Sequence, residues 1–164
     1  MPGMPLLHPV PDSVLARIGD VTVSFALLES QLEMLAGSLL GLQQPVTRAI
    51  TADLNAPALR DLILSVYRES RGEDDDFADL AALVSRAKGA TTERNKIVHA
   101  LWAAGRDADS VTQIGTTAKG GKLNTAFDEK TADAIAKVAL DIRSVAEDVQ
   151  TFTLKRLDGP PLTD

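Results

Sequence analysis

Apolar residues recur every three or four positions between residues 12 and 40. Eight of them follow alternating steps of four and three: Val14, Ile18, Val21, Phe25, Leu28, Leu32, Leu35 and Leu39. This spacing puts all eight side chains on one stripe of an α-helix. Asp12 or Ser13 supplies a cap for the first turn, and Gly41 followed by Pro45 ends the helix. The pattern therefore predicts a long helix that buries one face.

A second regular stripe lies near the other end of the chain, between residues 128 and 157. Its apolar positions follow steps of three and four: Ile135, Val138, Ile142, Val145, Val149 and Phe152. Because the two long stripes are alike, we expect the first and last helices to be antiparallel or dimeric neighbours in a bundle.

Shorter helices are predicted at residues 45–53 and 57–70, with Asn55 capping the second. A further helical pattern runs from residue 77 to residue 101, and Gly89 either kinks it or divides it into two helices. Residues 103–124 contain four glycines and a short β-branched run, which favours a hairpin or an extended excursion.

The predicted fold class is therefore all-α: an up-and-down bundle of four to five helices with a small β-hairpin or extended insertion before the last helix. The predicted organisation is an extended arm at residues 1–11, one helical domain at residues 12–157 and a tail at residues 158–164.

Composition narrows the chemistry and the compartment. The chain of 164 residues has no cysteine, which excludes disulfides and thiolate metal sites. Its first eleven residues carry no Lys or Arg, unlike the start of a signal peptide, and no uninterrupted apolar run is long enough for a membrane span. We therefore expect a soluble cytoplasmic protein with no membrane association.

Charge is distributed unevenly. The net charge of −6 argues against a protein whose whole surface follows a nucleic-acid backbone. Residues 84–106 nevertheless contain five basic side chains and one acidic one, so they form a basic island in an acidic chain. Such an island is typical of a local phosphate site, although a solvated helix face can carry the same charges.

The polar residues best suited to catalysis lie within residues 93–102, where apolar neighbours pack the segment against the core. Asn95 and His99 are four positions apart and so share one helical face within hydrogen-bonding reach. Arg94 is offset by one position, but its long side chain can reach that face and offer several donors to a phosphate. An imidazole beside a guanidinium suits RNA transesterification, in which the substrate's 2′-hydroxyl is the nucleophile.

The segment Arg94-Asn95-x-x-x-His99 resembles the motif of HEPN domains (higher eukaryotes and prokaryotes nucleotide-binding), in which Arg, four to six residues and then His lie on a helix of an α-helical bundle. The similarity extends to a long first helix containing Leu28-Glu29-x-x-Leu32, an aromatic residue soon after His99 and a closing helix. About ten residues match closely and most of the chain loosely.

This resemblance implies a metal-independent endoribonuclease, often a toxin or defence effector, whose site forms where two motifs meet in a homodimer. It assigns phosphate binding to Arg94, general acid or base catalysis to His99 and an orienting role to Asn95. Lys96 and Lys88 would guide the RNA backbone. Glu29 would support Arg94 from the first helix, and Glu93 is a second supporting candidate. No cofactor or metal is expected, and a partner such as an antitoxin or regulatory protein is expected. Because the chain is acidic and has only one Trp and one Tyr to stack on bases, we expect RNA recognition that is not sequence specific.

Structural explanations exist for the same residues. Arg94 and His99 could form a buried network or a dimer salt bridge, and Asn95 could satisfy the helix backbone. Lys96 and Lys88 could belong to a solvated face, Glu29 could mark the edge of the apolar stripe, and Trp102 could fill the core. The alternative function is a catalytically inactive helical dimer that binds a nucleotide or a protein. Spacings typical of zinc proteases, phosphate-binding loops and serine hydrolases are absent from the sequence.

Overall fold

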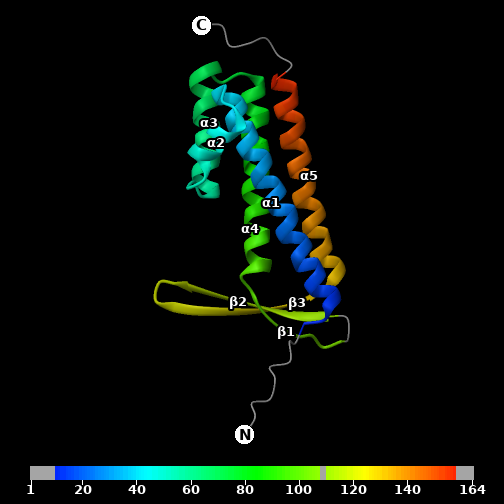
Figure 1. Cartoon of the computed structure of the whole chain (residues 1–164). Coiled ribbons are helices and arrows are strands. Elements are labelled where there is room, and N and C mark those ends of the chain that lie inside the picture. The colour runs from blue at the N-terminus through cyan, green and yellow to red at the C-terminus, as the bar shows by residue number, and fades with distance from the viewer. Residues whose placement is uncertain (1–9, 108–109, 158–164) are drawn as a thin grey trace.

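The computed structural model describes residues 10–107 and 110–157, apart from the side chains of residues 119, 156 and 157. The predicted tail at residues 158–164 and nearly all of the predicted arm lie outside this range. The described part consists of α1 (Asp12–Leu40), α2 (Gln44–Thr51), α3 (Ala56–Arg71), α4 (Asp75–Val98), β1 (Leu101–Ala104), β2 (Ser110–Lys119), β3 (Lys122–Thr131) and α5 (Ala132–Leu157). Figure 1 shows the long helices standing side by side, with the strands crossing their lower end.

The centre of the bundle is the pair α1 and α5. Their stripes meet in one core, with Leu28, Leu35, Ile135 and Ile142 all nearly inaccessible to solvent. The two helices are neighbours as predicted, but they run parallel rather than antiparallel (Figure 1). The reason is that α4 returns the chain to the lower end before α5 begins.

Helix α4 is continuous, which decides the question that Gly89 leaves open in the sequence. Gly89 therefore does not divide it into two helices, and a Cβ built at this position would meet nothing within 4 Å. Asp74 caps the helix by accepting from the backbone N–H of Phe77 at 2.8 Å. The cap on α3 is the predicted one, since the Asn55 side chain accepts from the N–H of Ala58 at 2.9 Å.

The prediction of an all-α fold is wrong, because the chain forms a three-stranded antiparallel sheet in the order β1-β2-β3. Leu101 pairs with Ile114, which pairs in turn with Phe127. The sequence pattern hid two of these strands. Leu101, the first residue of β1, continues the apolar spacing of α4, so the predicted helix extends to it. Residues 128–131, the end of β3, directly precede α5 and fall within the helix predicted for residues 128–157.

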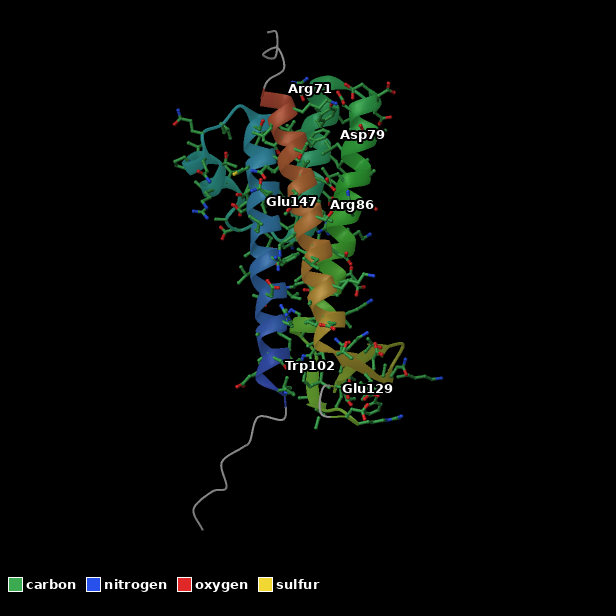
Figure 2. All side chains as sticks on the ribbon, turned by 90° about the vertical axis from the view of Figure 1, so that its right-hand side faces the viewer. Arg71, Asp79, Arg86, Trp102, Glu129 and Glu147 are labelled. Atoms are coloured by element: carbon green, nitrogen blue, oxygen red, sulfur yellow. The ribbon has the colours of Figure 1, made fainter. Side chains whose placement is uncertain are left out.

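One face of the sheet closes the lower end of the bundle. Val111 is fully buried there, and Trp102 packs against the core, where Figure 2 shows it between the helices and the strands. On the opposite face Leu101 and Phe127 keep 69% and 71% of their surface exposed. The strands β2 and β3 extend beyond the helices as a ribbon (Figure 1).

Helix α1 bears on the expectation that the chain has no segment long and apolar enough to span a membrane. Among the described residues it is the one helix long and apolar enough to cross a membrane by length and composition, with a mean hydropathy of 1.2. The same helix carries the principal packing surface for α5, α3 and α4 (Figure 1). Its apolar character is thus explained at least in part by its place in the core.

Candidate functional site

The candidate site lies at the end of α4, where the helix meets the sheet. The helix ends at Val98, and His99 occupies the C-cap position with φ −100° and ψ 4°. The backbone N–H of His99 still donates to the carbonyl of Asn95 at 3.1 Å. The imidazole is therefore carried by the last, exposed turn of a helix rather than by its interior.

Two side chains from the sheet segment hold this last turn in place. Gln113 Nε2 on β2 donates to the carbonyl of Lys96 at 2.5 Å, and Trp102 Nε1 on β1 donates to the carbonyl of Ile97 at 3.1 Å. Both carbonyls belong to the end of a helix, where intrahelical donors run out. The sheet thus satisfies the helix end and fixes the position of the turn that carries His99.

Arg94 contacts both of the other predicted catalytic residues, Asn95 and His99. Its Nη1 donates to Asn95 Oδ1 at 2.9 Å and approaches His99 Nε2 at 3.2 Å. A guanidinium only donates, so Nε2 is the acceptor in this contact and the imidazole proton lies on Nδ1. Asn95 and His99 are thus connected through Arg94, with no direct bond between the two in the described part of the chain, and the catalytic roles of all three residues stay predictions.

The Arg94 guanidinium has no carboxylate partner at ion-pair distance within the described part of the chain. Its Cζ instead lies over the ring of Phe25 on α1, 5.1 Å from the ring centre, and its Nε is buried without a hydrogen-bond partner. An arginine held by an aromatic face and two neutral acceptors keeps its positive charge available to an anion.

Glu29 is close enough to Arg94 to interact electrostatically but forms no ion pair with it. Burial raises the pKa of the Glu29 carboxyl, the positive charge of Arg94 offsets part of that rise, and repulsion by Glu33 adds to it. The supporting role predicted for Glu29 is therefore not seen as a direct contact. Glu29 is one of the residues that line a cavity of about 220 Å³ between α1, the link from α2 to α3, and α4.

The basic island is largely neutralised in the folded chain. Three of its five cations are paired: Lys96 Nζ with Glu93 at 2.7 Å, Arg86 with Asp148 at 2.6 Å and Arg106 with Glu129 at 4.0 Å. Figure 2 shows Arg86 on α4 and Glu129 on the strands below it. Glu93 thus neutralises Lys96 instead of supporting Arg94. Lys88 is exposed and, within the described residues, has no ion pair.

Two residues of this region were not predicted from the sequence. Phe25 belongs to the apolar stripe of α1, and nothing in its spacing separates it from purely structural core residues. Gln113 reaches α4 only because the sheet folds under the helix, so no local pattern identifies it. Among the described residues, no three His, Asp or Glu side chains gather into a group that could hold a metal ion.

No family model matches the chain, and neither the curated proteins nor the solved structures include a significant match. The resemblance to HEPN domains therefore stays a prediction, which depends on residues 94–99 and on their helical setting.

Proposed function

We propose that this chain is a metal-independent endoribonuclease of HEPN type. The observation that carries the proposal is the contact between Arg94 Nη1 and His99 Nε2, made at an exposed helix end where no carboxylate neutralises the arginine. It supplies one phosphate-binding cation and one unprotonated imidazole nitrogen at hydrogen-bonding distance. These are two of the groups that phosphodiester transesterification requires from a protein, a charge stabiliser and a general base.

In the proposed reaction the scissile phosphate accepts hydrogen bonds from Arg94, which releases Nε2 of His99 from its contact with the guanidinium. The imidazole then removes the proton of the ribose 2′-hydroxyl as the 2′-oxygen attacks phosphorus. The bond from phosphorus to the 5′-oxygen breaks, and this oxygen takes up a proton. The products are a 2′,3′-cyclic phosphate and a 5′-hydroxyl end. Arg94 stabilises the charge that accumulates on the phosphorane oxygens, and Asn95 holds Arg94 in place.

The proton for the leaving oxygen must come from a second acid on the other side of phosphorus. The described part of each chain offers one imidazole, His99. We therefore propose a homodimer in which His99 of a second copy, in its protonated imidazolium form, supplies that proton, so that the two exposed helix ends form one composite site. We further propose a cytoplasmic location, where RNA is available, and an antitoxin or other regulatory protein that restrains the activity.

The test is incubation of the purified chain with end-labelled RNA in EDTA, with Arg94→Ala and His99→Ala as variants. Each should lower the cleavage rate by about 100-fold or more, the usual effect of removing a catalytic proton carrier or charge stabiliser. The matched control is Arg86→Ala, which removes an exposed arginine of the same helix that is paired with Asp148. Its rate should stay near that of the wild type.

Equal rates in all four proteins would contradict the assignment of these residues, and cleavage that EDTA abolishes would contradict a metal-independent mechanism. No cleavage by the folded wild-type dimer would favour the alternative, an inactive helical dimer that binds a nucleotide or protein.

A further inference from the structure

The cavity beside Arg94 shares walls with the proposed site. Phe25, whose ring lies under the Arg94 guanidinium, also lines this cavity of about 220 Å³. Thr91 lines it as well, one helical turn before Arg94 on α4. Figure 1 shows how α2 and α3 flank the upper parts of α1 and α4, so that the link between them forms the remaining wall. A group bound here would be next to a phosphate held by Arg94.

The walls of the cavity combine apolar surface with polar atoms of one kind. Leu32, Leu54 and Leu59 supply the apolar part. Thr51 and Thr91 line the cavity too, and their hydroxyls donate to the carbonyls of Thr47 and Ala87 at 3.0 and 2.8 Å. Because each hydroxyl proton is already used within its own helix, these threonines have only oxygen lone pairs left to offer a ligand.

The acidic residues of the cavity add further acceptors. Glu33 lies 3.9 Å from Arg48, which neutralises part of its charge. Glu29 is an exposed residue with no ion pair or hydrogen bond within the described residues, and partial burial raises the pKa of its carboxyl. A partly desolvated carboxylate without donors gains most from a ligand that offers N–H groups.

Arg60 fixes the polar side of this cavity. Only 7% of its surface is exposed, and its Nη1 donates to Thr91 Oγ1 at 3.1 Å. Thr91 therefore has both its proton and one lone pair engaged, which holds its hydroxyl in one orientation. A fixed acceptor in an apolar wall discriminates between ligands better than a freely rotating one.

From this arrangement we infer that the cavity is a nucleobase subsite for guanine, with the Glu29 carboxylate accepting from the adjacent N1–H and N2–H groups of the base. The inference rests on the proposed function for the position of the phosphate, which Arg94 would hold while the base enters between α1, α3 and α4. Recognition of an unstacked base through its Watson–Crick edge is a common mode of RNA binding. Such a subsite would give a preference for guanine, in contrast to the expectation from the sequence that RNA recognition is not sequence specific. Guanine fits best because two of its donors lie side by side and match the two oxygens of a carboxylate.

The experiment measures binding of nucleosides to the full-length His99→Ala protein, which cannot cleave on the proposed mechanism. Guanosine, adenosine, cytidine, uridine and propylammonium are titrated separately, with chemical shifts of the protein as the readout. Guanosine should bind at least about tenfold more tightly than each of the others, since a mismatched edge leaves the carboxylate unpaired. Tighter binding of another nucleoside, equal binding of all four, or preference for propylammonium would overturn the guanine assignment.

Two further variants, each added to the His99→Ala protein, locate the binding. Glu29→Gln should weaken guanosine binding about tenfold or more because one acceptor becomes a donor. The matched control is Glu69→Gln, an exposed glutamate on α3 that does not line the cavity. It should leave binding unchanged. Unchanged binding in the Glu29→Gln protein, or no guanosine binding by the folded protein, would overturn the inference.

Failure of this inference can be told apart from failure of the proposed function. Guanosine binding without RNA cleavage by the wild type would keep the subsite and remove the nuclease. Cleavage of RNA without guanosine binding would keep the nuclease and remove the subsite. Guanosine 5′-monophosphate tests whether the base subsite and the phosphate site are neighbours. It should bind more tightly than guanosine, and Arg94→Ala should reduce this difference in affinity while leaving guanosine binding intact.

Discussion

Arg143 and Arg94 both contact α1 from neighbouring long helices, and they differ in whether a carboxylate neutralises the guanidinium. Arg143 on α5 donates to Asp20 Oδ1 at 2.6 Å and to Ser24 Oγ at 3.0 Å, so a carboxylate neutralises it. Arg94 on α4 has Asn95, His99 and the ring of Phe25 instead, with no carboxylate at ion-pair distance in the described part of the chain. The comparison separates an arginine that holds two helices together from one whose charge remains available.

The largest expected effect comes from removing each arginine in turn. Arg94→Ala should lower RNA cleavage about 100-fold or more while changing the free energy of unfolding little, because its Nε is unsatisfied in the fold. Arg143→Ala should lower the free energy of unfolding by about 1–2 kcal/mol, since Asp20 and Ser24 lose a charged partner that is partly shielded from water. Cleavage assays and urea denaturation measure the two effects. Similar stability losses in both variants would remove the distinction.

The second prediction gives Arg94 the kind of partner that Arg143 has. Asn95→Asp replaces the acceptor at 2.9 Å by a carboxylate of nearly the same shape. The new charge should neutralise the arginine and repel the phosphate, so cleavage should fall about tenfold or more. Asp61→Asn, an exposed change on α3 away from the site, is the control. A cleavage rate that Asn95→Asp leaves unchanged would show that the charge of Arg94 is not used.

A smaller effect is expected from loosening the helix end without touching the site. Gln113→Leu removes the donor to the carbonyl of Lys96 and leaves that carbonyl without its partner from the sheet. The turn that carries His99 should become less well positioned, which lowers kcat several-fold and leaves KM nearly constant. Steady-state kinetics with an oligonucleotide substrate measure both. A change in KM alone would argue that Gln113 acts on binding instead.

The smallest expected effect is the pH dependence that Glu29 adds to stability. Burial raises the pKa of Glu29 in the folded chain above the ordinary value of 4.5. In the pH window between the unfolded and folded pKa values, the folded chain therefore binds more protons than the unfolded chain. Stability should therefore fall as the pH rises through the window. Glu29→Gln should stabilise the chain slightly near pH 7 and not near pH 3.5, where the carboxyl is protonated in both states. Denaturation curves at these two pH values test the sign, and an equal effect at both would contradict it.

Sequence periodicity predicted the helices of this fold well and the sheet poorly. The stripe of α1 and the cap at Asn55 are local features, so the predicted bounds of α1 and the predicted cap of α3 agree with the structure. The predicted cap of α1 by Asp12 or Ser13 is wrong, because Pro11 occupies the N-cap and no side chain among the described residues caps that helix. The strands depend on pairing between distant residues such as Leu101 and Ile114. Only the three-dimensional fold brings such residues together, and a β-strand that continues a helical phase leaves no separate trace in the sequence.

The candidate site shows the same division. Arg94, Asn95 and His99 were identified because they lie within six consecutive positions of a helix, a spacing that already places their side chains near one another. The residues that surround them were not predicted, because Phe25 and Gln113 come from α1 and β2, which lie far away in the sequence. The pairing of Lys96 with Glu93 was also missed, although the two are only three residues apart. Their local charges suggested a basic island, and only the folded partners show how much of it is neutralised.

The most direct test of the account uses an RNA oligonucleotide that the wild type cleaves at one position, compared with the same oligonucleotide carrying a single 2′-deoxy sugar immediately 5′ to the scissile phosphate. In EDTA, the first should yield a 2′,3′-cyclic phosphate and a 5′-hydroxyl end, and the second should remain intact at that position. Cleavage of the 2′-deoxy substrate at the same bond would contradict the account, because Arg94 and His99 would then serve a reaction that needs no 2′-hydroxyl.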